Sequence, residues 1–136
     1  MVWKIFLAGL VASIAWFIIG GVLYMNPVVA KIFKSEKSSA VRKMGGKGYM
    51  VSMYIMGCLL PSLLFAFVFY FVRPALPGAL LMDTVLFGLI LVTVRVVPRM
   101  IDMGLLTTYP RKLLAVDVVN GSIASFVIAL VLALML

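Results

Sequence analysis

The sequence predicts an all-α, polytopic membrane protein built as a bundle of four transmembrane helices. Hydrophobic residues make up 65% of its 136 residues and charged residues only 12%, about half of their share in an average soluble domain. Four apolar segments are longer than the ~20 residues that a helix needs to cross ~30 Å of hydrocarbon. We expect a single transmembrane domain over residues 1–136, with helices at about 3–25, 49–72, 79–101 and 112–136.

The first apolar segment is expected to be a retained helix. Lys4 precedes it, as in a signal peptide, but the apolar run from Ile5 to Met25 is longer than the ~7–15 residues of a signal-peptide core. Small residues at a spacing of four allow a neighbouring helix to approach closely, and here they are Ala8, Gly9, Ala12 and Ser13. We interpret them, together with the small residues of the last segment, as a contact for further helices, in a homo-oligomer or with other membrane subunits.

The stretch after this helix predicts a second, shorter one. Asn26 followed by Pro27 is typical of a helix start, because asparagine caps the helix and proline fits the first helical position. An amphipathic helix would lie in the plane of the lipid headgroups, with an apolar face formed by Val28, Val29, Ile32 and Phe33. The alternative is a plain solvated loop. Residues 35–48 are expected to be a flexible basic connector.

The second transmembrane segment contains Pro61, which predicts a kink. Three methionines recur every three residues, at Met50, Met53 and Met56, and such a ladder could bind Cu(I). Because the chain has no histidine and only one cysteine, Cys58, we interpret the methionines as packing residues and Cys58 as a small buried hydrophobe. We expect no metal and no cofactor. The short loop at 73–78 predicts a tight hairpin with the third segment.

Lysine and arginine predict the orientation. Of the twelve, only Lys4 and Arg73 fall on one side of the expected bundle, and the other ten fall on the opposite side. By the positive-inside rule, loops 26–48 and 102–111 are cytoplasmic and both termini lie outside, in a multi-pass protein of the cell (cytoplasmic) membrane. The net charge of +8 is then explained by topology and by contact of the basic loop with anionic lipid headgroups, so we expect no nucleic-acid partner.

Polar residues near the third turn could meet across it. With the turn centred near Leu106, Arg95 lies eleven residues before it and Asp117 eleven residues after it. We therefore expect these two side chains to pair at equal depth, about 8–10 Å inside the cytoplasmic boundary. The same argument at the second turn predicts an interfacial pair of Arg73 with Asp83.

A candidate anion-binding site comprises Arg95, Arg99, Asp102, Asp117 and Asn120. In one interpretation Arg95 and Asp117 form a structural tie, and Arg99 and Asp102 are a solvated cap. In the other, the arginines line a cytoplasm-facing pocket for a phosphate, a carboxylate or a lipid headgroup, since guanidinium groups bind such anions with two hydrogen bonds. Because Arg99 is left without an intramembrane partner, it is the stronger functional candidate.

The sequence supports no catalytic residue. It shows no nucleophile next to a base, no set of metal ligands and no pair of carboxylates, so we expect no enzyme. The leading interpretation is a structural or accessory membrane subunit. The alternative is a small transporter, or an anion- or lipid-binding membrane protein. Four-helix drug exporters of similar size carry an acidic residue in the first helix, and this first helix has none.

Two stretches resemble a family of small four-helix bacterial and archaeal membrane proteins that is known only as a domain of unknown function. One is residues 20–27 (GGVLYMNP) with Lys31 following, and the other is residues 109–114 (YPRKLL) running into Asp117, Asn120 and Gly121. The resemblance covers most of the chain. It implies the four-helix architecture, and it implies no activity because the family has none established.

Overall fold

The computed structural model describes residues 2–35 and 47–136. Helices account for 91% of these residues, and this part of the chain contains no strand. It holds four helices that are long and apolar enough to cross a membrane, at Val2–Tyr24, Met50–Ala75, Leu80–Leu106 and Arg111–Met135. The predicted fold class, an all-α bundle of four transmembrane helices, is confirmed.

The first and last spans are single helices, α1 (Val2–Tyr24) and α7 (Arg111–Met135). A short helix, α2 (Pro27–Ser35), follows the first span. The second span consists of α3 (Lys47–Tyr54), the π-helical turn η1 (Ile55–Leu59), α4 (Leu60–Val72) and a 3-10 turn, η2 (Arg73–Ala75). The third consists of α5 (Leu80–Leu91), the π-helical turn η3 (Val92–Val96) and α6 (Val97–Leu106).

The third span is longer than the sequence predicts. It continues to Leu106 instead of ending at residue 101, so Asp102 is helical and the loop before α7 is only residues 107–110. The predicted helix stops just before Asp102, but a charged residue does not by itself end a helix. The helix ends at Thr107, whose backbone is extended (φ −131°, ψ 163°).

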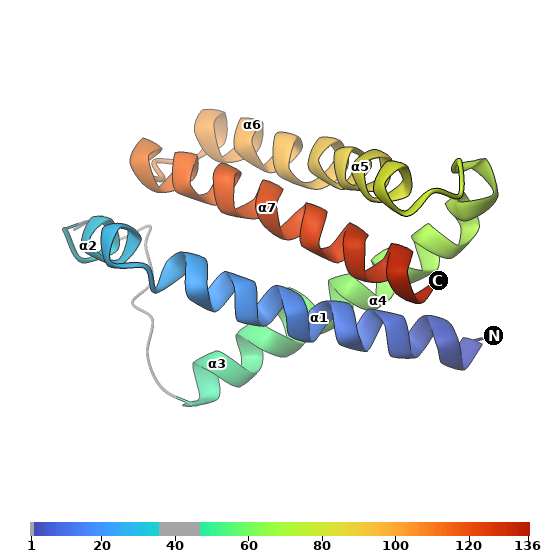
Figure 1. Ribbon diagram of the computed structural model, residues 1–136. Coiled ribbons are helices and arrows are strands. Elements are labelled where there is room, and N and C mark those ends of the chain that lie inside the picture. Colours follow the sequence, from blue (N-terminus) through green and yellow to red (C-terminus); the bar gives the residue numbers. More distant parts are fainter. Residues whose placement is uncertain (1, 36–46) are drawn as a thin grey trace.

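α1 and α7 form the middle of the bundle. The third span packs on α7, and α4 packs on α1, so the second and third spans lie on opposite sides (Figure 1). α4 and α5 meet near their turn, where the rings of Phe69 and Phe87 stack edge to face at 4.9 Å. They diverge away from it, and the far ends α3 and α6 lie well apart. The hairpin predicted from the short loop is therefore tight only at the turn.

The small residues of α1 are used inside the bundle. Ala8, Gly9, Ala12 and Ser13 are all buried. A Cβ on Gly9 would lie only 2.8 Å from a side-chain carbon of Leu63 and 3.0 Å from its Cα, and the Ser13 hydroxyl lies 2.9 Å from that of Tyr54. Close approach of helices at this face, which the spacing predicts, therefore occurs with the chain's own second span.

Pro61 and Pro98 each follow a π-helical turn. η1 ends two residues before Pro61, and η3 ends two residues before Pro98. In each turn a backbone N–H reaches the carbonyl five residues back, from Leu60 to Ile55 and from Val97 to Val92. Proline lacks an N–H and crowds the preceding turn, and widening the helix by one residue relieves this crowding.

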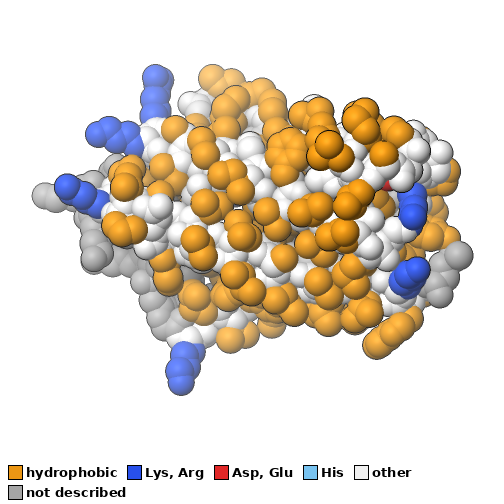
Figure 2. Space-filling model, in the orientation of Figure 1, with side chains coloured by type: hydrophobic (Ala, Val, Ile, Leu, Met, Phe, Trp, Pro, Cys, Tyr) orange, Lys and Arg blue, Asp and Glu red, His pale blue; other side chains and the backbone are white. Residues whose placement is uncertain are grey.

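The surface is divided as a membrane protein requires. On the face seen in Figure 2, hydrophobic side chains cover the middle of the molecule, and lysine and arginine project at its two ends. At the start of α2, the Asn26 side chain accepts a hydrogen bond of 3.0 Å from the Val28 N–H, which confirms the predicted helix start. The basic connector predicted over 35–48 lies, except at its ends, outside the described residues.

Candidate functional site

Arg95 lies deep within the third span. It is 15 residues from Leu80 and 11 from Leu106, the ends of that span, and it belongs to the π-helical turn η3. Its guanidinium carbon lies 4.1 Å from the ring centroid of Trp16 on α1 and 5.9 Å from that of Phe65 on α4. One of its Nη1 hydrogens is donated to the Ser125 hydroxyl of α7, at 3.1 Å. The direct contacts of this partly buried cation are thus neutral groups from three other spans.

The predicted pair of Arg95 with Asp117 is not formed. Asp117 pairs instead with Arg99, whose Nη2 lies 4.0 Å from Oδ2. The reason is that the third span is longer than predicted, so the loop comprises only residues 107–110. Arg99 and Asp117 are about equally far from the centre of this loop, and they therefore lie at the same depth. The prediction that Arg99 lacks a partner was wrong for the same reason. The pair is loose, since the Arg99 side chain is 65% exposed and that of Asp117 only 11%.

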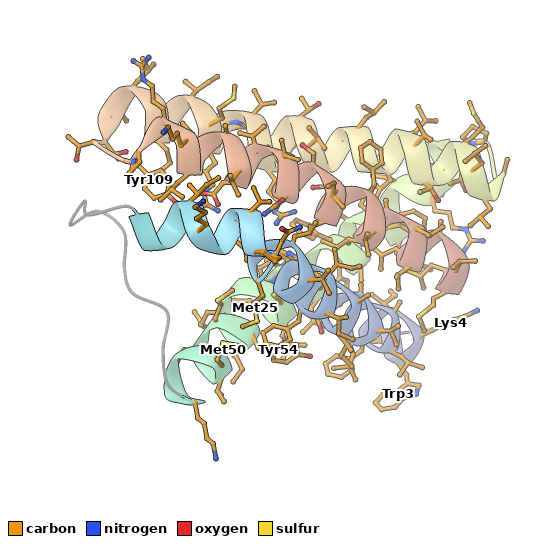
Figure 3. All side chains as sticks on the ribbon, turned by 60° about the vertical axis from the view of Figure 1, so that its left-hand side comes forward. Trp3, Lys4, Met25, Met50, Tyr54 and Tyr109 are labelled. Carbon is orange, nitrogen blue, oxygen red and sulfur yellow. The ribbon has the colours of Figure 1, made fainter. Side chains whose placement is uncertain are left out.

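Two tyrosines complete the surroundings of Asp117. The Tyr24 hydroxyl, at the end of α1, donates to Oδ1 at 2.7 Å, and the Tyr109 hydroxyl, in the loop before α7, donates to Oδ2 at 3.0 Å. Tyr109 lies at the end of the bundle opposite to Trp3 and Lys4 (Figure 3). Its partial burial, together with the negative charge of Asp117 and the hydrogen bond to it, raises the pKa of Tyr109 to about 12.

Sequence reasoning missed both tyrosines. Aromatic residues near the end of a transmembrane helix usually mark the membrane interface, so the position of Tyr24 does not by itself indicate a polar partner. A tyrosine eight residues before an intramembrane aspartate, as Tyr109 is before Asp117, was the one available signal. It becomes informative only once the length of the loop is known.

A small cavity of about 40 Å³ lies between the third span and α7. Its polar groups are Arg95, Arg99 and Asp117, and it is completed by Val96, Met100, Leu114, Val118 and Gly121. Gly121 allows the two helices to approach here, because a Cβ at this position would lie 3.3 Å from Val96. The cavity is therefore small, and it admits water-sized groups.

The other two predicted site residues stand apart from this cavity. Asn120 is buried, at 7% exposure, and its Nδ2 has no hydrogen-bond partner in the part of the chain that the structure describes. Asp102 is exposed on α6. The structure therefore brings together three of the five predicted residues, and it places Asn120 three positions from Asp117 on α7.

At the opposite end, the predicted pair of Arg73 with Asp83 is also absent from the described residues. Asp83 is buried, at 6% exposure, and its Oδ1 accepts a hydrogen bond of 3.0 Å from the backbone N–H of Gly78. Gly78 has a φ of +90°, a left-handed conformation that glycine adopts without strain. The partner of this carboxylate is therefore a backbone amide of the turn itself. Asp83 also lies in the first turn of α5, where the helix dipole favours a negative charge.

The sulfur-containing residues of the second span divide into two groups. Cys58 is buried, as predicted. Met56 is 67% exposed, whereas Met50 and Met53 are 37% and 38% exposed, so the packing interpretation does not hold for Met56 and none of the three is buried. Within residues 2–35 and 47–136 no three histidine, cysteine or acidic side chains gather as a metal site would require.

These features define a four-span helical membrane protein with an intramembrane arginine beside a small polar cavity. The chain belongs to the family described as "Protein of unknown function (DUF1761)", whose family model matches residues 7–133. No curated protein and no solved structure matches it. The family resemblance found in the sequence is confirmed.

Proposed function

We propose that this membrane protein binds a small anionic group in the cavity between the third span and α7. The group is an oxyanion, either free or carried by a lipid headgroup. Arg95 is the observation that carries the proposal. Of the acidic residues in the described ranges, Asp83 is engaged at the other end, Asp102 is exposed and Asp117 pairs with Arg99. Arg95 therefore has no ion pair among them.

The neutral neighbours of Arg95 leave much of its binding capacity unused. A guanidinium carries five N–H donors, and one donated hydrogen bond, to Ser125, is found within the described residues. An arginine near the middle of a transmembrane helix costs about 2.5–3.5 kcal/mol, and such residues commonly mark binding or transport sites. The cation–π contact with Trp16 offsets about 0.5–2 kcal/mol of this cost. An anion in the adjoining cavity would satisfy both the remaining donors and the charge.

A structural or accessory role is the second candidate, and the contacts of Asp117 favour it. They join the end of α1, the loop before α7 and α6 to α7 itself. The small residues of α1 no longer argue for an oligomer, because they pack inside the bundle. Neither candidate assigns a reaction, and we propose a binding protein without catalytic activity.

The proposed orientation follows the charges. We place the end that carries Asp117 and Tyr109 on the cytoplasmic side of the cell membrane, with both termini outside. The described basic residues support this, because Lys31, Lys47, Arg111 and Lys112 belong to that end and would contact anionic headgroups there. The cavity would then open toward the cytoplasm.

The test is anion binding by the purified protein in detergent, measured by calorimetry with inorganic phosphate as the probe. We expect Arg95→Gln to weaken binding about tenfold or more, because a hydrogen bond to a charged group is worth about 1.5–3 kcal/mol. Arg111→Gln is the matched control, since Arg111 is exposed and outside the cavity. Equal affinity of the wild type and Arg95→Gln, with unchanged thermal unfolding, would refute the proposal.

A further inference from the structure

We infer from the charges around the cavity that its ligand is an oxyanion that keeps one acidic O–H, such as the monoanion of a phosphate monoester. The inference rests on the proposed function and names the chemical class of its ligand. It depends on Asp117, which lines the same cavity as the two arginines. A site for a simple anion would not need a carboxylate in its wall.

The cavity presents donors on one side and an acceptor on the other. Arg95 and Arg99 are four residues apart on the third span, and Asp117 faces them from α7. Two guanidinium groups and one carboxylate leave one positive charge in the wall of the site. A monoanion balances this charge, and its unprotonated oxygens can accept hydrogen bonds from the arginines.

Asp117 can accept one further hydrogen bond. Its two oxygens provide about four lone-pair sites, and the Tyr24 and Tyr109 hydroxyls occupy one on each oxygen. Arg99 contributes only a loose contact, at 4.0 Å. An oxyanion without a proton would bring its negative oxygens against this carboxylate. An O–H at the same position would instead donate a short, charge-assisted hydrogen bond.

The size of the cavity suits one oxyanion head. A volume of about 40 Å³ restricts the ligand to a small head, such as a single phosphoryl group. Inorganic phosphate and the phosphate-monoester headgroup of a lipid share this chemistry, and the experiment separates these two sources.

The first arm of the experiment compares two ligands of equal charge. At mildly acidic pH, methyl phosphate is a monoanion with one O–H, and dimethyl phosphate is a monoanion with none. We expect calorimetry to show that the wild type binds methyl phosphate about tenfold more tightly or better, the value of one charge-assisted hydrogen bond. Equal affinities would overturn the inference and leave the proposed function intact, whereas no binding of either ligand or of phosphate would refute the proposed function itself.

The second arm uses Asp117→Asn, whose amide can donate to an unprotonated oxygen. We expect the preference for the monoester to disappear because dimethyl phosphate binds more tightly to this variant. If the variant kept the preference, ligand size and not the O–H would be the cause, and the inference would fail. Should the variant not fold, the wild-type comparison still decides the matter.

The third arm identifies the source of the ligand. Native mass spectrometry of the protein from nanodiscs compares phosphatidic acid, a monoester, with phosphatidylglycerol, a diester. Selective retention of phosphatidic acid that Arg95→Gln abolishes would indicate a lipid ligand. Calorimetric binding of inorganic phosphate without lipid selectivity would indicate a free oxyanion. Tighter retention of phosphatidylglycerol than of phosphatidic acid would contradict the inference.

Discussion

Each end of the bundle holds a shielded carboxylate, and the two carboxylates have different kinds of partner. Asp83 accepts a hydrogen bond from the Gly78 amide, five residues away in the same turn. Asp117 accepts from Tyr24, 93 residues away in sequence, and from Tyr109 in the loop before its helix. The first carboxylate therefore stabilises a local turn, and the second joins elements that are distant in sequence.

The comparison also shows why both predicted ion pairs fail. Equal distance from a turn places two residues at equal depth only if the centre of the turn is known. At the third turn the centre is displaced, so Asp117 meets a different arginine. At the second turn the carboxylate of Asp83 accepts a hydrogen bond from the backbone amide of Gly78. Arg73 is exposed and does not supply the partner.

The largest effect on stability is expected for Asp117→Ala. It removes the acceptor of two tyrosine hydroxyls at once, and each polar group left without a partner costs about 1–3 kcal/mol. We expect a loss of about 3 kcal/mol in the free energy of unfolding, measured in detergent by steric trapping. Asp117→Asn keeps one carbonyl oxygen as an acceptor and should lose less than Asp117→Ala. A loss below that of Asp83→Ala would reverse the comparison.

A smaller effect is expected for Asp83→Ala. It removes one hydrogen bond and one favourable charge at the start of α5, and each contribution is about 0.5–1 kcal/mol. We expect a loss of about 1–2 kcal/mol in the same assay. Hydrogen exchange should increase at Gly78 and in the first turn of α5, with no change around Tyr24. Exchange that increased at both ends would show that Asp83 stabilises more than its own turn.

The sequence predicts the fold well because the bilayer imposes its dimensions on the chain. Four apolar runs of sufficient length determine four spans whatever their contacts, and a side chain such as Asn26 acts on its own turn. The partners of Arg95, Arg99 and Asp117 depend on two features that hydropathy does not encode. These are the continuation of α6 to Leu106 and the widened turn η3, which together set which side chains face α1 and α7.

The role of the small residues is a similar case. Ala8 and Gly9 indicate close helix packing, and such packing occurs. Their spacing carries no information on whether the approaching helix belongs to the same chain. Only the position of α4 against α1 answers that question.

The smallest effect concerns pH, and it distinguishes the two ends by chemistry. The partner of Asp83 is a backbone amide, which does not titrate, whereas Asp117 is bonded to Tyr109, whose pKa is raised from 10.0 to about 12. A raised pKa means that the folded state holds this phenol proton more tightly than the unfolded state. The contribution is therefore complete below pH ~10 and is lost as the pH rises through ~12. Because Tyr109 is partly exposed, solvent screening reduces the effect.

Comparison of the wild type with Tyr109→Phe isolates this contribution. The two proteins should differ most in thermal stability below pH ~10 and converge as the pH approaches ~12. Tyr70→Phe serves as the control for loss of a tyrosine hydroxyl, since Tyr70 lies at the opposite end of the bundle, beside Arg73 and Pro74. A constant difference between the wild type and Tyr109→Phe over this range would mean that Asp117 does not hold the phenol proton. In that case Tyr24 and Arg99 alone would account for the stabilising contacts of Asp117.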